Sequence, residues 1–336
     1  MTERLKFTIR VPNKKILHAL EQRLERVQGG IGKLGVLEKL VLKLGVLQGS
    51  LHPVIQHPKF LLFAGDHLTG LKLSNDPISP AARRVNKMLL DEAPVLRIAH
   101  QAEIDVKIID CGIHYPLEGF IDYWMHKGSL ILNRKIRGAA RDFIHEASLT
   151  THEVHQAIAY GADLINSYYY LGSNVFLLGH IGSSCKISTL ALGASIFEVE
   201  PSSLLHLITV EDEILLKNAV LALKKHPKTR DPINQIAIWG TYQIAMMVGA
   251  ILKLAEKELL IVVDDEEALL ALYLAWKLHP EVAEYAILAQ NSSLIAQHIQ
   301  RQIQIQPVFD FKISAEEGMG AVPAFQLLKM ACEIFN

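Results

Sequence analysis

The chain has 336 residues, of which 50 % are hydrophobic and 21 % are charged, and its formal net charge is −1 with 34 basic against 35 acidic residues. This length suffices for one large domain or two modest ones, and the near-neutral charge excludes the strongly basic surface that nucleic-acid binding requires. Three widely separated cysteines, Cys111, Cys185 and Cys332, exclude a disulfide framework and a CxxC zinc site, and they indicate a reducing cytoplasm.

The N-terminal segment predicts one strand followed by two helices. Residues 1–6 are too polar for a signal peptide. Residues 5–11 alternate apolar and polar side chains, as a half-buried edge strand does. A charged amphipathic helix is predicted at 13–28, and after a glycine-rich link a second helix runs to Leu47.

The rest of the chain alternates short apolar runs with helical patterns. The runs predict buried parallel strands at 60–65, 106–112, 174–180, 259–265, 286–290 and 307–313. Helices are predicted at 80–101, 151–171, 211–225, 231–255, 265–278 and 293–302. We therefore expect an α/β fold with a mostly parallel, Rossmann-like sheet of about six strands between helices.

Two units are predicted from this order. The large α/β domain spans 51–321, and residues 1–50 together with a C-terminal helix at 322–336 form a smaller helical unit. One run, 236–255, has about the length of a membrane span. It contains Gln243, Lys253 and two glycines, which is more typical of a buried helix that packs closely through small residues. A membrane-associated protein built around this run is the alternative.

Polar residues follow the predicted strands at the point where each strand ends. They are Asp66-His67, Asp110, Gly179-His180, Asp264-Asp265, Gln290-Asn291 and Glu316-Glu317. Right-handed crossovers place the carboxyl ends of parallel strands at one edge, where open sheets bind their ligands. The sequence therefore predicts a ligand site at this edge.

The last of these strand ends carries the strongest candidate for chemistry. Glu316 and Glu317 precede two glycines and an apolar helical pattern with Pro323 in its first turn. A carboxylate there can act as a base, and the free amides at a helix start can hold an anion. The alternative is an acidic, solvated loop whose glycines only make the turn.

The loop at 179–184 is a weaker candidate for phosphate binding. Its glycines and serines follow a predicted strand and precede a helical run, which suits a phosphate. It matches neither a Walker A loop nor a dinucleotide fingerprint. A plain turn with a serine cap explains the same residues.

Three further groups have structural explanations beside the functional ones. Asp66-His67 could orient a substrate or form a dyad, although neighbours in sequence seldom face the same way. His152 and His155 could ligate a metal, but no third ligand is evident nearby. The acidic run 264–267 begins a helix, where it favours the helix dipole. Lys217, taken alone, is a surface lysine of an amphipathic helix.

Short segments along nearly the whole chain resemble one enzyme family. Residues 32–38 match G-S-L-G-x-L-E, 63–67 match F-A-A-D-H, 109–112 match V-D-V-G, 147–150 match A-M-T, 231–232 with 239–245 match D-P…G-G-F-E-I-A, and 317–321 match the end of R-L-G-E-G-T-G-A. Together they resemble the nicotinate-nucleotide:dimethylbenzimidazole phosphoribosyltransferases, which assemble the nucleotide loop of cobalamin. Met88 falls where that family has a methionine lining the base pocket.

The departures from the family gather at the predicted active edge. The phosphate loop G-E-M-G-I-G-N-T-T is replaced by residues 179–187, which keep only its first and fourth positions. Asp264-Asp265-Glu266 stands at V-D-G-F, and Gln290-Asn291-Ser292 replaces H-R-S. Residues 314–316 replace Arg-Leu-Gly ahead of the glutamate. This pattern predicts an altered substrate or a member that has lost the reaction.

The resemblance implies transfer of the phosphoribosyl group of nicotinate mononucleotide to an aromatic base such as 5,6-dimethylbenzimidazole, giving an α-ribotide and nicotinate. It assigns Glu317 as catalytic residue. The phosphate and ribose would contact Gly179, Gly182, Ser183, Ser184, Lys186, Lys217, Gly318 and Gly320, and the base pocket would include Met88, Ile181, Ala315 and Asp66. It implies no cofactor and no metal.

The implied enzyme is a cytoplasmic homodimer that acts on small molecules and binds neither nucleic acid nor membrane. Because the phosphate loop is altered, a non-catalytic or two-subunit homologue that binds a nucleotide or base is the alternative. Release of nicotinate distinguishes the two.

Overall fold

The computed structural model describes residues 6–28, 32–72, 78–90, 92–114, 130–200, 203, 213–291, 293–313 and 317–336. Its strands are β1 (Lys59–Gly65), β2 (Asp105–Gly112), β3 (Ile131–Asn133), β4 (Val175–Ile181), β5 (Leu260–Val263) and β6 (Ala286–Leu288). Its α-helices are α1 (Leu17–Gln28), α2 (Val36–Gln48), α3 (Leu68–Leu71), α4 (Pro80–Leu89), α5 (Pro94–Gln101), α7 (Thr151–Tyr170), α8 (Lys186–Phe197), α9 (Glu213–Lys225), α10 (Pro232–Trp239), α11 (Tyr242–Glu256), α12 (Glu266–Leu278), α13 (Leu294–Ile303) and α14 (Ala321–Phe335). Short 3-10 helices lie at Lys14–Ile16 (η1), Ser183–Cys185 (η2) and Pro280–Tyr285 (η5).

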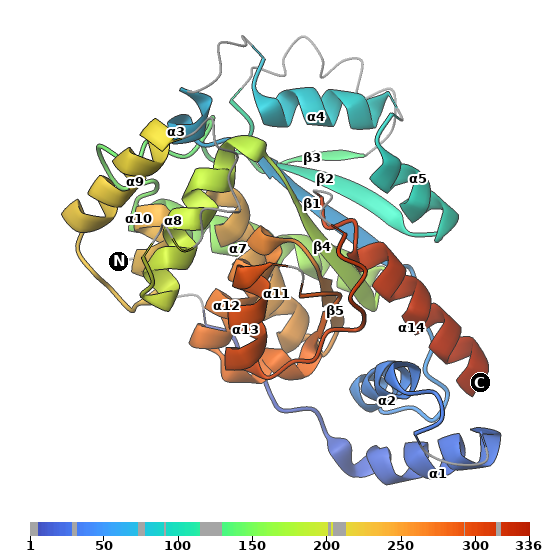
Figure 1. Ribbon diagram of the computed structural model, residues 1–336. Helices are drawn as coiled ribbons and strands as arrows, with labels where there is room; N and C mark the ends of the chain where they lie inside the picture. The colour runs from blue at the N-terminus through green and yellow to red at the C-terminus, as the bar shows by residue number, and fades with distance from the viewer. Residues whose placement is uncertain are drawn as a thin grey trace.

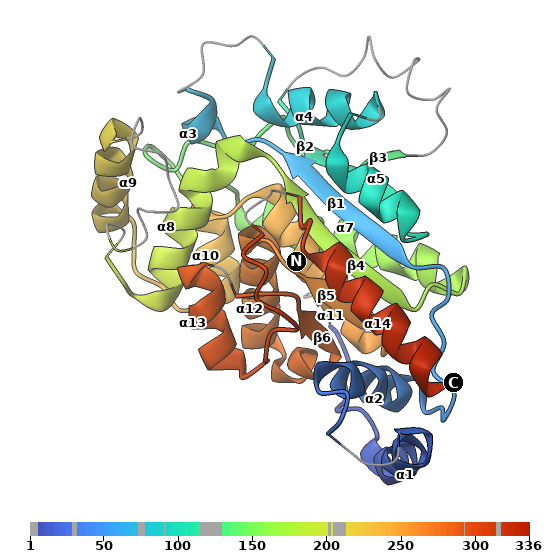
Figure 2. The same ribbon diagram turned by 45° about the vertical axis from the view of Figure 1, so that its right-hand side comes forward.

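The six strands form one parallel sheet in the order β3-β2-β1-β4-β5-β6. All residues of β4 and β5 are buried, as expected for strands covered on both faces. α5 and α14 lie in front of the sheet in Figure 2, and α7 and α11 lie behind it. The structure thus confirms the predicted α/β fold with a parallel sheet between helices.

The sixth strand is not the one that the sequence predicts. In the segment 307–313 only Pro307 pairs with the sheet, through an isolated bridge to Leu288. Lys312 has a φ of 54°, which interrupts an extended chain. The prediction of a strand at 307–313 is therefore wrong, and the place at the other edge is taken by β3, a strand of 3 residues beside β2.

The predicted N-terminal edge strand is also absent from its described part, residues 6–11. Backbone groups of this segment form hydrogen bonds with side chains, not with the backbone of a neighbouring strand. The amide of Thr8 donates to Glu256 Oε1 at 2.8 Å, and the hydroxyl of Tyr285 donates to the carbonyl of Arg10 at 2.5 Å. An alternating pattern here marks an extended segment that lies on α11 and η5.

Two predicted helices are each divided in two. The pattern at 80–101 forms α4 and α5, because Pro94 disfavours helical backbone at the residue before it. The run 236–255 is divided between α10 and α11, where the Thr241 hydroxyl accepts the Ile244 amide at 3.3 Å and caps the second helix. Of the helices that the structure describes, none is long and apolar enough to cross a membrane.

The helices α7 and α11 pack unusually closely because each has a glycine at the contact. A Cβ atom on Gly161 would lie 1.9 Å from the carbonyl oxygen of Met246, and one on Gly249 would lie 2.0 Å from that of Ile158. The helix backbones therefore touch, and α11, the longer part of the run that resembles a membrane span, is a buried helix that packs through its small residues.

The N- and C-terminal helices lie together at one end of the molecule. α1 and α2 are neighbours there, and α2 packs against α14 (Figure 1). α14 also contacts β4 and β5. It therefore joins the proposed small helical unit, residues 1–50 and 322–336, to the sheet of the proposed large domain, residues 51–321.

Candidate active site

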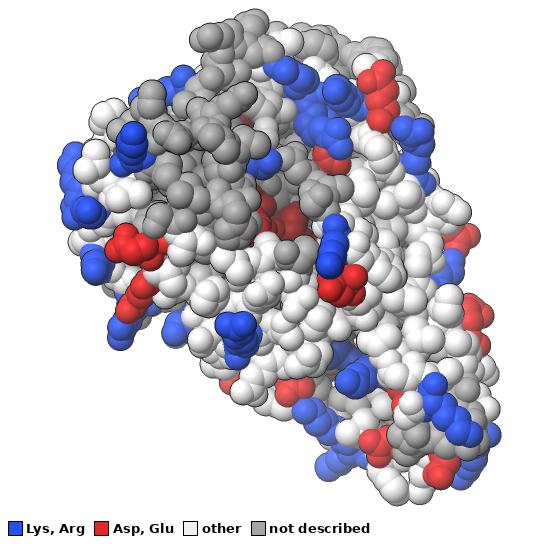
Figure 3. Space-filling view, viewed as in Figure 1, with Lys and Arg blue, Asp and Glu red and all other residues white. Residues whose placement is uncertain are grey.

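A cavity of about 720 Å³ opens at the carboxyl ends of β4, β5 and β6. Most of the ionisable side chains that line it are acidic: Asp264, Asp265, Glu266, Glu267, Asp310 and Glu317. The lysines of its lining are Lys186 and Lys312. Figure 3 shows acidic side chains in a hollow on the face seen in Figure 1. The predicted ligand edge therefore opens into a cavity whose ionisable lining is mostly acidic.

Glu317 lies at this cavity in a bidentate ion pair. Its side chain is 1 % exposed, and its φ of 73° places the residue in the left-handed turn ahead of α14. Nη2 of Arg84 donates to Oε2 at 2.8 Å, and Nε of Arg84 donates to Oε1. Sequence reasoning missed Arg84, which lies on α4. The predicted contributions of Ala315 and Glu316 lie outside the described residues.

Two of the predicted phosphate-binding glycines have a packing role. A Cβ atom on Gly179 would lie 2.6 Å from the carbonyl oxygen of Glu317, and one on Gly318 would lie 2.9 Å from that of Leu178. The turn that carries Glu317 can rest directly on β4 only because both positions lack a side chain. Neither glycine is part of the cavity lining.

The loop after β4 also uses most of its polar groups within the protein. Gly182, Ser183 and Lys186, three of the predicted phosphate or ribose contacts, line the cavity. The Ser184 hydroxyl, however, donates to Asp66 Oδ1 at 2.9 Å and accepts the amide of His67 at 3.2 Å. It is 5 % exposed, and both of these hydrogen bonds tie it to the end of β1 instead of leaving it directed to the cavity.

Asp264 accepts a hydrogen bond from a backbone amide of the turn at residues 317–320. Its Oδ2 accepts the amide of Gly320 at 2.8 Å, whereas its Oδ1 is buried with no hydrogen-bond partner among the described residues. Burial raises the pKa of Asp264 to about 6, although the Gly320 amide and the nearby Gln290 side chain oppose the shift. The Gln290 amide group is itself held by the backbone of Ile313, at 2.7 and 3.1 Å.

The acidic run at the start of α12 confirms the capping interpretation and adds to it. Asp265 accepts the amide of Ala268 at 2.8 Å, and its other oxygen accepts the amide of His180 at 2.7 Å. Burial and the neighbouring Glu267 raise the pKa of Asp265 well above its ordinary value. Burial and Glu267 likewise raise the pKa of Glu266 to about 7.

Other predicted site residues lie away from the cavity lining. Met88 and Ile181 are each 1 % exposed in the core, and Asp66 is fully buried. Lys217 is exposed on α9. Lys217 is not among the residues that line the cavity, so its phosphate contact stays a prediction, whereas Lys186 and Lys312 do line it.

Asp66 and His67 do not form a catalytic dyad. Asp66 accepts the amide of His114 at 3.0 Å in addition to the Ser184 hydroxyl, whereas Nε2 of His67 lies 3.1 Å from the Ser148 hydroxyl. Burial lowers the pKa of His67 to about 3, against the opposing charge of Asp142. His67 is thus a neutral core residue, and the structural interpretation of this pair holds.

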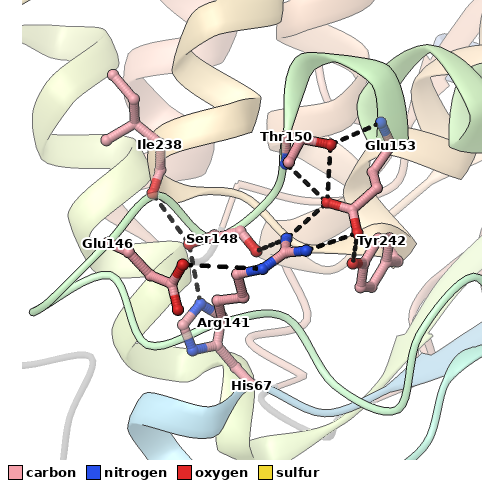
Figure 4. A network of polar contacts seen from close by, with 8 residues as sticks. All are labelled: His67, Arg141, Glu146, Ser148, Thr150, Glu153, Ile238 and Tyr242. Atoms are coloured by element: carbon pink, nitrogen blue, oxygen red, sulfur yellow. Dashed lines mark hydrogen bonds and ion pairs between the residues drawn. The ribbon is translucent and has the colours of Figure 1, made fainter.

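Figure 4 shows the polar network that His67 joins, between the strand edge and the start of α7. Arg141 donates to both oxygens of Glu153, at 2.6 and 2.9 Å. The amide of Thr150 and the hydroxyl of Tyr242 donate to the same carboxylate, at 2.7 and 3.0 Å. Burial opposes ionisation, but these hydrogen bonds prevail and lower the pKa of Glu153 to about 2.

Glu153→Gln is expected to lower the free energy of unfolding at pH 7 by about 1–3 kcal/mol, because Arg141 then loses its charged partner. The folded-state pKa of Glu153 lies below its ordinary 4.5, so its contribution is present above pH 4.5 and is lost as the pH falls toward 2. Urea unfolding of wild type and variant at several pH values measures the difference, which should shrink over that window.

Glu146→Gln is the matched control. Glu146 lies 3.9 Å from the same guanidinium and is 66 % exposed, so its loss should cost no more than about 0.5 kcal/mol. Equal destabilisation by the two variants would contradict the assignment of Glu153 as the buried partner.

No metal-binding group is evident in the part of the chain that the structure describes: it holds no set of three His, Cys, Asp or Glu side chains placed to bind an ion. His152 is exposed and His155 is half-buried on α7. His152 is therefore solvated, whereas His155 is only partly exposed.

Comparisons with known proteins agree on one family. The family model DBI_PRT, described as phosphoribosyltransferase, matches residues 9–336. A protein of Parabacteroides distasonis named nicotinate-nucleotide–dimethylbenzimidazole phosphoribosyltransferase is 27 % identical over 342 residues, which cover 99 % of this chain and 96 % of that protein. A protein of the same name from Vibrio parahaemolyticus is 28 % identical and covers 94 % of each chain.

Solved structures show the same fold. A crystal structure of the enzyme of that name from Thermus thermophilus has a TM-score of 0.81 at 22 % identity and covers 96 % of both chains. A second structure from that organism, titled CobT, has a TM-score of 0.83 at the same identity. The chain therefore shares the fold of these two structures.

Proposed function

Because the chain belongs to the DBI_PRT family of phosphoribosyltransferases, we propose that it transfers the phosphoribosyl group of nicotinate mononucleotide to an aromatic base. The acceptor is 5,6-dimethylbenzimidazole or a related lower-ligand base, and the products are an α-ribotide and nicotinate for cobalamin synthesis. The observation that carries the proposal is the buried carboxylate of Glu317 at the carboxyl edge of the sheet. The relatives' names, over nearly the full chain, support the choice of substrates.

The reaction exchanges one bond at the anomeric carbon of the ribose. A ring nitrogen of the base attacks that carbon while the bond to the pyridinium nitrogen of nicotinate breaks, and the electron pair of the broken bond stays with nicotinate. The transition state carries positive charge on the sugar, which a nearby carboxylate stabilises. Glu317 also accepts the proton that the attacking nitrogen loses.

Arg84 is part of this mechanism because it holds both oxygens of Glu317. The guanidinium fixes the orientation of the carboxylate, as bidentate pairs do. To take a proton, one oxygen must exchange its contact with Arg84 for one with the acceptor base. Arg84 is thus a positioning residue for the proposed catalytic glutamate.

Incubation of the purified protein with nicotinate mononucleotide and 5,6-dimethylbenzimidazole tests the proposal, with released nicotinate and the ribotide separated by chromatography. Formation of both products in equal amounts is the expected result. No release with any aromatic base contradicts the proposal.

A non-catalytic or two-subunit homologue is the second candidate. The acidic cavity and the paired state of Glu317 favour it, since neither is expected of a site poised for a phosphorylated substrate. This candidate predicts thermal stabilisation by a nucleotide or base without turnover. Full turnover by the single purified chain would exclude it.

The proposal includes a cytoplasmic homodimer. The cysteines Cys111, Cys185 and Cys332 are all free and buried, which supports a reducing compartment. Light scattering coupled to size-exclusion chromatography measures the mass of the assembly, and a mass of one chain would contradict the dimer.

A further inference from the structure

The carboxylates of the cavity occupy the amides that the sequence assigns to a phosphate. The two loops predicted to hold the phosphate are 179–184 and 318–320. In the first, the amide of His180 donates to Asp265, and in the second, the amide of Gly320 donates to Asp264, at 2.7 and 2.8 Å. Backbone amides of this kind bind phosphate when they are free. Here the chain supplies its own anions to both loops.

The remaining acceptor in the cavity also disfavours a phosphate. Asp264 is 8 % exposed and lines the cavity, and its Oδ1 has no hydrogen-bond partner among the described residues. A buried carboxylate oxygen needs a donor, and an ionised phosphate offers only acceptors. Asp264 therefore offers a phosphate no favourable contact.

The charged residues that line the cavity also disfavour a phosphate. The four successive acidic residues 264–267 line the cavity together with Asp310, against Lys186 and Lys312. The charge of Lys186 already acts on Glu266, whose carboxylate it favours. A phosphate with a charge of about −1.5 to −2 would be repelled by the ionised members of this group, and it would oppose the ionisation of Asp264, Asp265 and Glu266, whose pKa values burial already raises. A ribose hydroxyl enters the cavity without that repulsion.

We propose that this chain takes an unphosphorylated ribosyl donor, a pyridinium riboside such as nicotinate riboside, at least as readily as the corresponding nucleotide. The geometry that carries this is the pair of loop amides closed by Asp264 and Asp265 at a cavity whose ionisable lining is mostly acidic. The inference rests on the proposed function and differs from it in one feature of the donor, the absence of the 5′-phosphate.

The bond changes are those of the proposed reaction without the phosphate. A nitrogen of the acceptor base bonds to the anomeric carbon as the bond to the pyridinium nitrogen breaks. The released electron pair makes nicotinate neutral at its ring nitrogen, and the proton of the acceptor passes to Glu317. The product is an α-linked nucleoside of the acceptor base.

The test compares two donors on the full chain, nicotinate riboside and nicotinate mononucleotide, with 5,6-dimethylbenzimidazole as acceptor. We expect kcat/KM for the riboside to equal or exceed that for the nucleotide. A preference for the nucleotide of tenfold or more overturns the inference but leaves the proposed function intact. If neither donor releases nicotinate, the proposed function fails, and calorimetric binding of the two donors decides: tighter binding of the riboside supports the inference, and tighter binding of the nucleotide, or of neither, overturns it.

Glu266→Gln provides a second readout. Glu266 lines the cavity and binds no backbone amide in the described hydrogen bonds, so its charge can be removed with little change of shape. The ratio of nucleotide use to riboside use should rise about tenfold. Glu25→Gln, at an exposed position of α1, should leave the ratio unchanged. An equal ratio in Glu266→Gln and wild type contradicts the electrostatic part of the inference.

Discussion

Glu317→Gln is expected to reduce kcat by about 10²–10⁴-fold, with a small change in KM, because a general base contributes that much when it acts only in the transition state. The amide keeps the size of the side chain but cannot accept the proton or stabilise charge on the sugar. Initial rates of nicotinate release at saturating substrates measure the effect.

Two controls separate chemistry from folding in this experiment. Glu333→Gln changes an exposed glutamate of α14, a short distance along the chain, and should leave kcat unchanged. Circular dichroism and thermal unfolding should show that Glu317→Gln is folded, even though it loses the charge partner of Arg84. A folded variant with undiminished kcat would remove Glu317 from the mechanism.

Gly161→Val is expected to destabilise the fold by about 3 kcal/mol or more, near the upper end for overpacking a core. The reason is the contact between α7 and α11, where the first added carbon would already lie 1.9 Å from the Met246 carbonyl oxygen. The helices must separate to admit the side chain, which opens voids between α11 and the sheet. The urea midpoint and the melting temperature measure the loss.

Gly138→Ala is the matched control for a glycine substitution. The nearest atoms to a Cβ on Gly138 lie 3.8 Å away, and its backbone is not in the left-handed region. The change should therefore stay within about 0.5 kcal/mol. If Gly161→Val is as stable as Gly138→Ala, the helices are not held by backbone contact.

The sequence predicts the sheet where strands are long, apolar and central. The runs that form β1, β2 and β4 are covered on both faces, so their composition identifies them. β3 was missed because it has only 3 residues, which are half-buried or exposed at the edge of the sheet. Such a short segment shows no alternation of apolar and polar side chains. The segment 307–313 was misassigned because its apolar residues resemble those of a strand. In the structure two of them, Phe309 and Phe311, stack on each other instead, with ring centroids 4.1 Å apart.

The site was predicted in part, and what was missed depends on tertiary contacts. The position of Glu317 follows from its turn and from family resemblance. Arg84 gave no signal because an arginine in an amphipathic helix ordinarily faces solvent, and nothing local reveals a carboxylate more than two hundred residues away. The run 264–267 was correctly interpreted as a helix cap, but the contact of Asp264 with Gly320 required the fold.

The pairing of Arg84 with Glu317 also bears on how bases are distinguished. Arg84 and Met88 are four residues apart on α4, so both belong to one face of one rigid helix. Met88 is 1 % exposed in this structure, so a base that contacts it must first move α4, the helix that orients the proton acceptor. The enzyme would then distinguish bases by their reaction rates more than by their binding affinities. Two acceptors that compete in one reaction would show a selectivity that their separately measured affinities do not.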